Sequence, residues 1–129
     1  MMKSQKRYHL LIDVNDCSAD LLNKASQISA FIQELAYLSE MQILFGPEII
    51  KGSPVNPGFT GLAVIDYSHI AVHTFPSSRA LFIDLFSCKP FPVTRILSYI
   101  KEHLALEDSQ LTVQTINLDI SNAHSISLG

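Results

Sequence analysis

A chain of 129 residues with a formal net charge of −3 and 47% hydrophobic residues suits one hydrophobic core. Lysine and arginine form no cluster beyond "KSQKR" near the start, so nothing favours a nucleic-acid partner. No apolar run approaches the roughly 20 residues of a membrane helix, and no small-residue cleavage site follows the basic N-terminus. We therefore expect one cytoplasmic domain over residues 1–129, with neither nucleic acid nor membrane as partner.

Apolar patterning predicts the first elements in chain order. Residues 8–14, "YHLLIDV", are typical of a strand. Residues 19–38 repeat apolar side chains at steps of three and four, which predicts one long amphipathic helix after a possible N-cap at Ser18. "MQILF" at residues 41–45 predicts another strand, whereas residues 46–59 contain three prolines and three glycines and should form mostly loop.

The second half of the chain is expected to add three strands, a helix and a final strand. These are residues 60–66, 69–75, 79–87, 93–104 and 110–120. The second and third of these strands flank "PSS", which suits a tight turn between antiparallel neighbours. This order predicts an α+β two-layer sandwich, with two helices packed on one face of a mostly antiparallel sheet. The other face is then left needing a partner.

Reactive side chains concentrate in the central strands, as Ser68, His73 and Cys88, with Thr60 at the head of the first. Alone, each has a structural explanation as a turn residue, a satisfied histidine or a small buried thiol. Together they fit either a hydrolase or a self-processing site in which the serine attacks its own backbone. No G-x-S-x-G elbow surrounds Ser68, which weakens the hydrolase interpretation. The remaining histidines show no metal-ligand spacing, so no metal is implied.

Residues 60–88, "TGLAVIDYSHIAVHTFPSSRALFIDLFSC", resemble the core of the prokaryotic S-adenosylmethionine decarboxylases. That family's pattern is approximately (S/T)-G-hydrophobic run-E-S-H-(I/L)-x-(I/V)-H-T-W-P-E, followed by D-x-F-x-C. "SHIAVHT" and "DLFSC" fit closely, and the gaps of eight, five and fifteen positions between the four reactive residues are those of the family. With "YHLLIDVNDC" at the start, the resemblance covers residues 8 to about 116.

The resemblance implies a pyruvoyl-dependent enzyme that decarboxylates S-adenosylmethionine to the aminopropyl donor of spermidine biosynthesis. In this family the chain cuts itself before the matched serine, here between Tyr67 and Ser68. The products would be a β chain of residues 1–67 and an α chain of residues 68–129, whose first residue becomes the pyruvoyl group. The ketone of that group forms a Schiff base with the substrate amine and accepts electrons as carbon dioxide leaves.

The same resemblance implies roles for the other matched residues. His73 is similar to the family's processing histidine, which moves a proton, and Thr60 to a hydroxyl that assists processing. Cys88 resembles the proton donor to the substrate carbanion. The resemblance also implies a homodimer in which a second copy covers the open face or edge of the sheet.

Several positions depart from the family's pattern. Tyr67 replaces the glutamate before the cleaved serine, and Phe75 replaces a tryptophan that stacks near adenine. Ser77 stands where a glutamate normally holds both ribose hydroxyls, while Phe59 offers a further aromatic side chain for substrate. Two alternatives therefore stay open: a pyruvoyl decarboxylase of a smaller amino acid, such as ornithine or arginine, and an uncleaved, non-enzymatic binding subunit.

Overall fold

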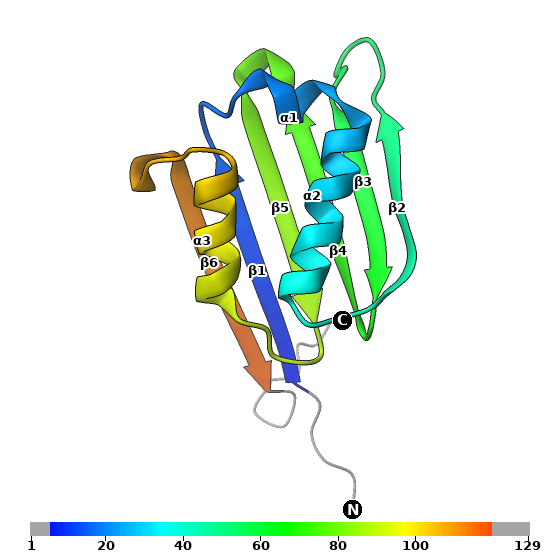
Figure 1. Cartoon of the computed structure of the whole chain (residues 1–129), viewed down its shortest axis with the longest axis vertical. Coiled ribbons are helices and arrows are strands. Elements are labelled where there is room, and N and C mark those ends of the chain that lie inside the picture. The colour runs from blue at the N-terminus through cyan, green and yellow to red at the C-terminus, as the bar shows by residue number, and fades with distance from the viewer. Residues whose placement is uncertain (1–5, 120–129) are drawn as a thin grey trace, which may run out of the picture.

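One antiparallel sheet with helices on a single face makes up the fold (Figure 1). The structure is a computed structural model and describes residues 6–119. Its six strands lie in the order β2-β3-β4-β5-β1-β6, and every pair of neighbours is antiparallel. The predicted α+β two-layer sandwich is confirmed. The elements are β1 (Lys6–Val14), α1 (Ala19–Asn23), α2 (Ala25–Leu38), β2 (Ile43–Lys51), β3 (Phe59–Ile65), β4 (Ser68–Phe75), β5 (Ala80–Ser87), α3 (Val93–His103) and β6 (Leu111–Asp119), with short 3₁₀ turns at Pro76–Ser78 and Asp108–Gln110.

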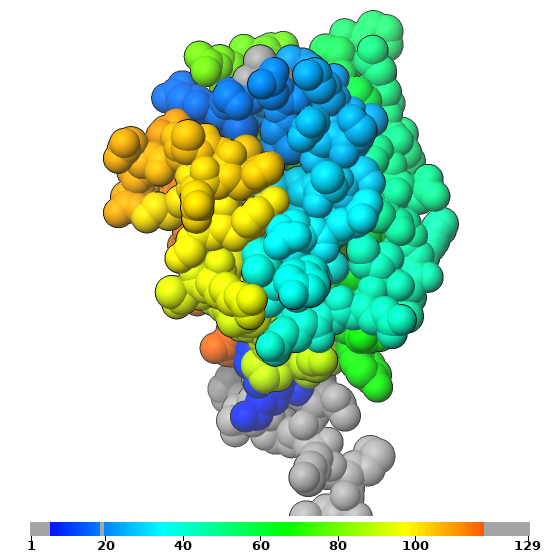
Figure 2. Space-filling view, viewed as in Figure 1, coloured from blue at the N-terminus to red at the C-terminus, as the bar shows by residue number. Residues whose placement is uncertain are grey.

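The core lies between the central strands and the helices α2 and α3. Alternate strand positions point toward the helices, because successive side chains of a strand lie on opposite faces. In the space-filling view α2 and α3 lie against each other over the centre of the sheet (Figure 2). Fully burying one such aliphatic side chain contributes about 1.5–3 kcal/mol. The largest fully buried side chains are Phe31, Leu10, Ile12, Leu22, Ile28, Ile32, Leu35, Ile65, Ile70, Leu81, Leu85 and Ile96.

The prediction of one helix over residues 19–38 is wrong, because Lys24 interrupts it in an extended conformation with φ −125° and ψ 113°. Ser18 occupies the N-cap position of α1, although its side chain makes no capping hydrogen bond. The carbonyl oxygen of Leu22 accepts a hydrogen bond from Thr74 Oγ1 at 3.2 Å, in β4. In a continuous helix this carbonyl oxygen would instead accept a backbone N–H from the next turn of the helix. Apolar spacing alone gives no sign of the contact with Thr74.

The predicted loop over residues 46–59 is also corrected, because β2 continues to Lys51 and the loop is confined to residues 52–58. Shifts of register on both sides of Phe45 accommodate Gly46 and Pro47 as an irregularity in the strand. Proline is tolerated there because β2 is an edge strand with one unpaired side. Gly46 has φ +89°, and a Cβ atom at this position would lie 2.8 Å from the Leu62 carbonyl oxygen. The final strand is confirmed as β6, while Ile120 lies outside the described residues.

The second face of the sheet carries apolar side chains that no helix of residues 6–119 covers. Their exposed fractions run from 41% to 65%. The prediction of an uncovered face therefore holds for the described part of the chain, and we refer to this surface as the open face. None of the described helices is long and apolar enough to cross a membrane. The large exposed apolar residues of the open face are Phe45, Ile50, Leu62, Val64, Phe82 and Ile116.

Candidate functional site

Ser68 begins β4, directly after the tight turn that joins β3 to β4. Its Oγ lies 2.7 Å from the Asp66 carbonyl oxygen and 3.3 Å from Met41 Sδ. Tyr67, the residue before it, has φ +57° and a side chain that is 77% exposed. A left-handed conformation is unfavourable for a residue with a branched side chain at Cβ or a bulky ring, so neighbouring contacts must hold this turn.

Cys88 lies beside the same turn. Its backbone N–H donates a hydrogen bond to the Tyr67 carbonyl oxygen at 3.3 Å, and the preceding residue, Ser87, pairs with Ser68 across β4 and β5. The carbonyl group of the Tyr67–Ser68 peptide bond therefore has a fixed backbone donor, which polarises it toward attack. The Cys88 residue is exposed, so its thiol is accessible from solvent at this end of the hairpin.

Thr60 and His73 meet at the other end of the hairpin. They are register partners of β3 and β4, with Thr60 Oγ1 and His73 Nδ1 3.0 Å apart. His73 follows Ser68 by five positions of extended strand, which corresponds to roughly 16 Å along β4. The two side chains also point to opposite faces, since Ser68 contacts the buried Met41 whereas His73 lies on the open face. One chain therefore does not bring its own Ser68 and His73 together.

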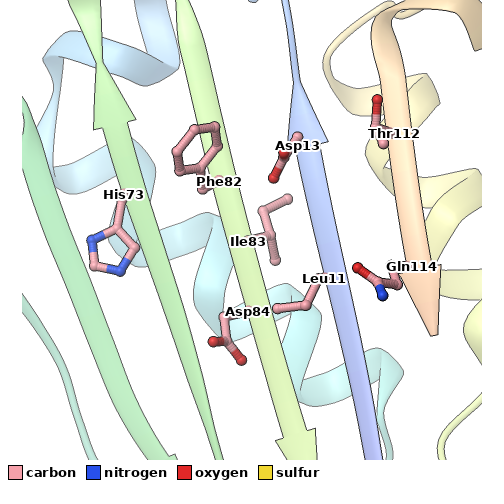
Figure 3. Close-up of a pocket in the computed structure, with 8 residues that line it drawn as sticks. All are labelled: Leu11, Asp13, His73, Phe82, Ile83, Asp84, Thr112 and Gln114. Carbon is pink, nitrogen blue, oxygen red and sulfur yellow. The ribbon is translucent and has the colours of Figure 1, made fainter. Parts of the chain in front are cut away.

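His73 lines a cavity of about 290 Å³ on the open face (Figure 3). Asp84 and Asp13 line the same cavity from β5 and β1, and the Asp84 carboxylate lies 2.6 Å from His9 Nε2. Sequence reasoning missed these acidic residues. The sequence does contain a pattern that could have revealed them. In "HLLID" and "FIDLF" an acidic residue interrupts a strand that is otherwise mostly apolar, at a position that faces away from the core. The remaining lining residues are Leu11, Phe82, Ile83, Thr112 and Gln114.

The three residues expected to contact substrate lie toward the His73 end of the hairpin. The Phe75 ring lies on the open face, with its centroid 4.8 Å from that of Phe82. Ser77 is exposed in the 3₁₀ turn directly after β4. Phe59 instead packs against the hydrophobic core, and its backbone N–H donates to Thr74 Oγ1 at 2.8 Å. Phe75 and Ser77 are thus accessible to a ligand, whereas Phe59 faces the helical side.

Cys17 is fully buried in the core, and this burial raises the pKa of its thiol above the ordinary value. The Ser18 backbone and the Arg79 guanidinium oppose this rise without cancelling it. A neutral buried thiol is a packing group rather than a nucleophile. Among the described side chains, no group of three or more His, Cys, Asp or Glu residues forms a candidate metal site.

Comparisons with known proteins show the family to which the chain is similar. A family model described as S-adenosylmethionine decarboxylase matches residues 8–116. The S-adenosylmethionine decarboxylase proenzyme of Clostridium botulinum (strain Hall) is 33% identical over 105 residues, which cover 81% of this chain and 88% of that protein. The proenzyme of the same name from Saccharolobus solfataricus is 33% identical over 75 residues, covering 58% of this chain and 57% of that protein.

A solved structure supports the fold. The crystal structure of the adenosylmethionine decarboxylase from Aquifex aeolicus matches with a TM-score of 0.74 at 21% identity, and the match covers 98% of this chain and 100% of that chain. This likeness concerns the backbone architecture alone. The family model spans most of the chain, and the clostridial relative aligns over most of both lengths. The chain therefore belongs to the S-adenosylmethionine decarboxylase family.

Proposed function

We propose that this chain is a proenzyme that cleaves itself between Tyr67 and Ser68 and then decarboxylates S-adenosylmethionine, supplying the aminopropyl donor for spermidine synthesis. The observation that carries the proposal is the geometry of one peptide bond. Its carbonyl oxygen accepts the Cys88 N–H, while the hydroxyl of the following serine is held beside the turn by the Asp66 carbonyl oxygen. The serine hydroxyl and the carbonyl before it are thus each held by a hydrogen bond, which restricts the motion of the two groups that an intramolecular acyl shift must join.

Self-cleavage proceeds through an ester, an elimination and a hydrolysis. Ser68 Oγ adds to the Tyr67 carbonyl carbon, the C–N bond breaks, and an ester forms together with a free amine at residue 68. The Cys88 N–H stabilises the negative charge that develops on the carbonyl oxygen during this step. Removal of the Ser68 α-proton then expels the Tyr67 carboxylate and leaves dehydroalanine. Its hydrolysis releases ammonia and produces the pyruvoyl group.

The residues around Ser68 fit such a group. Ser68 is partly buried at the end of the sheet, so a carbonyl at this position is sheltered on one side and reachable on the other. The pyruvoyl group supplies an electron sink for decarboxylation of a bound amino acid. Cys88, exposed beside it, would return a proton to the substrate carbon after carbon dioxide leaves. No metal is needed for this chemistry.

We further propose that two chains associate through their open faces, so that the Thr60–His73 pair of one protomer lies beside the backbone of the Tyr67–Ser68 turn of the other. Within one chain the two groups are roughly 16 Å apart on opposite faces. A two-fold axis between the sheets and perpendicular to the strands would reverse the strand direction. The His73 end of one hairpin would then lie against the Ser68 end of its partner. Association would also bury the exposed apolar side chains of the open face.

Intact mass under denaturing conditions tests self-cleavage directly. The wild-type protein should give two fragments, with an α chain that lacks a free amino group at its start, whereas Ser68→Ala should give one species of 14.3 kDa. Ser78→Ala, in the exposed turn after β4, is the matched control and should cleave normally. A wild-type chain that remains whole would contradict the proposal and favour the uncleaved binding subunit.

A second candidate function keeps the pyruvoyl chemistry but takes a smaller amino acid, such as ornithine or arginine. The observation in its favour is Ser77, which is exposed and neutral where a carboxylate would be needed to accept both ribose hydroxyls. Release of labelled carbon dioxide from S-adenosylmethionine, ornithine and arginine separates the candidates. If S-adenosylmethionine is the substrate, Ser77→Glu should lower its KM without improving the reaction of the smaller amino acids. Release from ornithine or arginine alone would establish the second candidate.

A further inference from the structure

The turn that carries the Tyr67–Ser68 bond is tied to the segment that follows α2. The Gln42 N–H donates to Asp66 Oδ2 at 2.9 Å, and the Asp66 N–H donates to the Gln42 carbonyl oxygen at 3.1 Å. Both backbone polar groups of Gln42 are thus bound by one residue of the turn. We call this pair of hydrogen bonds the Gln42–Asp66 clamp.

The buried side chain of Met41 packs against the Ser68 hydroxyl from the helical side, and we call this contact surface the floor of the site. Met41 is 6% exposed, and its Sδ lies 3.3 Å from Ser68 Oγ and 3.7 Å from Ser87 Oγ. A thioether is only a weak hydrogen-bond acceptor. The thioether therefore restricts the motion of the Ser68 hydroxyl but binds its proton only weakly. The nearer Asp66 carbonyl oxygen accepts a hydrogen bond from the hydroxyl and orients it.

The clamp acts on a residue in an unfavourable backbone conformation. Tyr67 has φ +57°, and a tyrosine keeps a left-handed conformation only where surrounding contacts impose it. Asp66 holds the turn on one side of Tyr67, and the Cys88 N–H holds the Tyr67 carbonyl oxygen on the other. Without the Asp66 carboxylate, the turn can relax and carry the carbonyl carbon away from the Ser68 hydroxyl.

We propose that Asp66 is a positioning residue for self-cleavage, which acts through the Gln42–Asp66 clamp, with Met41 as the floor that confines the Ser68 hydroxyl. This inference rests on the proposed function, because it concerns the rate at which the Tyr67–Ser68 bond is cut. The resemblance assigns no role to either residue. Asp66 lies two positions before the serine, and Met41 lies far earlier in the chain.

The test follows the appearance of α chain over time by denaturing mass spectrometry, starting from freshly folded proenzyme. Asp66→Ala should slow cleavage about tenfold, the effect of losing one orienting hydrogen bond. Asp66→Asn retains an oxygen that can accept the Gln42 N–H and should recover most of the wild-type rate. Asp20→Ala, an exposed aspartate in α1, is the matched control and should cleave at the wild-type rate.

Two further measurements distinguish a positioning role of Asp66 and Met41 from an effect on the stability of the whole chain. In the uncleavable Ser68→Ala chain, Asp66→Ala and Asp66→Asn should show equal thermal unfolding midpoints, so that rescue by asparagine cannot be a stability effect. Met41→Leu preserves the floor's volume and should cleave within about threefold of wild type, whereas Met41→Ala should cleave more slowly. The reverse order would overturn the role of Met41.

The outcomes also separate this inference from the proposed function. If wild type cleaves and Asp66→Ala cleaves equally fast, the positioning role of Asp66 is overturned while self-cleavage stands. If Asp66→Asn is as slow as Asp66→Ala, the clamp is overturned as the cause. A wild-type chain that stays whole overturns both together.

Discussion

The two ends of the β3–β4 hairpin differ in how completely one chain builds them. At the Ser68 end, contacts from three separate segments meet around one peptide bond: Met41 and Gln42 after α2, Asp66 in the turn, and Cys88 after β5. At the His73 end, Thr60 holds the imidazole toward a cavity on the open face, with an acidic lining. A chain that cuts its own backbone needs the bond clamped locally. Side chains that contact a second chain or a ligand, as proposed for Thr60 and His73, must instead lie on an exposed face.

Mixing two inactive variants tests this difference most strongly. Ser68→Ala and His73→Ala should each remain whole when expressed alone. When they are co-expressed in equal amounts, random pairing should allow about half of the His73→Ala chains to cleave, because each mixed dimer contains one complete site. Intact mass distinguishes the two precursors. His69→Ala, which removes a histidine of the same strand and face, is the control and should cleave alone. A mixture that stays wholly uncleaved would assign processing to residues of one chain.

A charge on the open face should have the next largest effect. Val64 is 45% exposed on that face, whereas Val113 is 40% exposed on the helical side of the sheet. Val64→Glu would place an unpaired carboxylate in an apolar interface and should raise the dimer dissociation constant at least about 100-fold. Val113→Glu should leave it unchanged. Sedimentation velocity at micromolar concentration gives the measurement. Equal behaviour of the two variants would contradict association through the open face.

Loss of the hydrogen bond at the His73 end should have a smaller effect. Thr60→Val keeps the side-chain shape but removes the hydroxyl 3.0 Å from His73 Nδ1. The imidazole would then lose its fixed orientation, and cleavage should slow about tenfold. Thr60→Ser should restore most of the rate. A valine variant that cleaves normally would show that Thr60 has no part in processing.

Local patterns predicted the sheet well because the side chains of a strand alternate between its faces. The turn at "PSS" and the pairing of β4 with β5 follow from this alternation and from turn chemistry. The break at Lys24 and the continuation of β2 past Pro47 depend on distant partners, Thr74 and β3. Residue spacing within one segment carries no information about such contacts, so both predictions failed there.

The candidate site shows the same limit. Ser68 and His73 are five positions apart, an odd number, so one strand must place them on opposite faces. The spacing that identifies the family thus already implied their separation. The clamp was beyond prediction, since Gln42 precedes Asp66 by 24 positions and contributes only backbone groups. A backbone donor has no residue type by which a sequence can reveal it.

The helical layer, remote from the cavity at the His73 end, provides the smallest expected effect. Tyr99 stacks on Phe31 with ring centroids 5.9 Å apart, and burial, aided by the Glu34 carboxylate, raises the pKa of its phenol to about 12. The unfolded chain ionises this group near 10. The unfolded state therefore loses the proton first, and the stability that the neutral phenol contributes declines as the pH rises from about 10 to 12.

Urea unfolding of the uncleavable Ser68→Ala chain at pH 9 and pH 11 measures this decline. Because Tyr99 is only partly buried, solvent screening limits its contribution to on the order of 1 kcal/mol. Tyr99→Phe should lose that much less stability between the two pH values, while Tyr37→Phe, at a side chain that is 71% exposed, should behave like the parent. In the cleavable chain, Tyr99→Phe should leave the cleavage rate unchanged. A slower rate would mean that the helical layer helps to hold the Tyr67–Ser68 turn. The contacts at the two ends of the β3–β4 hairpin would then not be enough to explain the rate of cleavage.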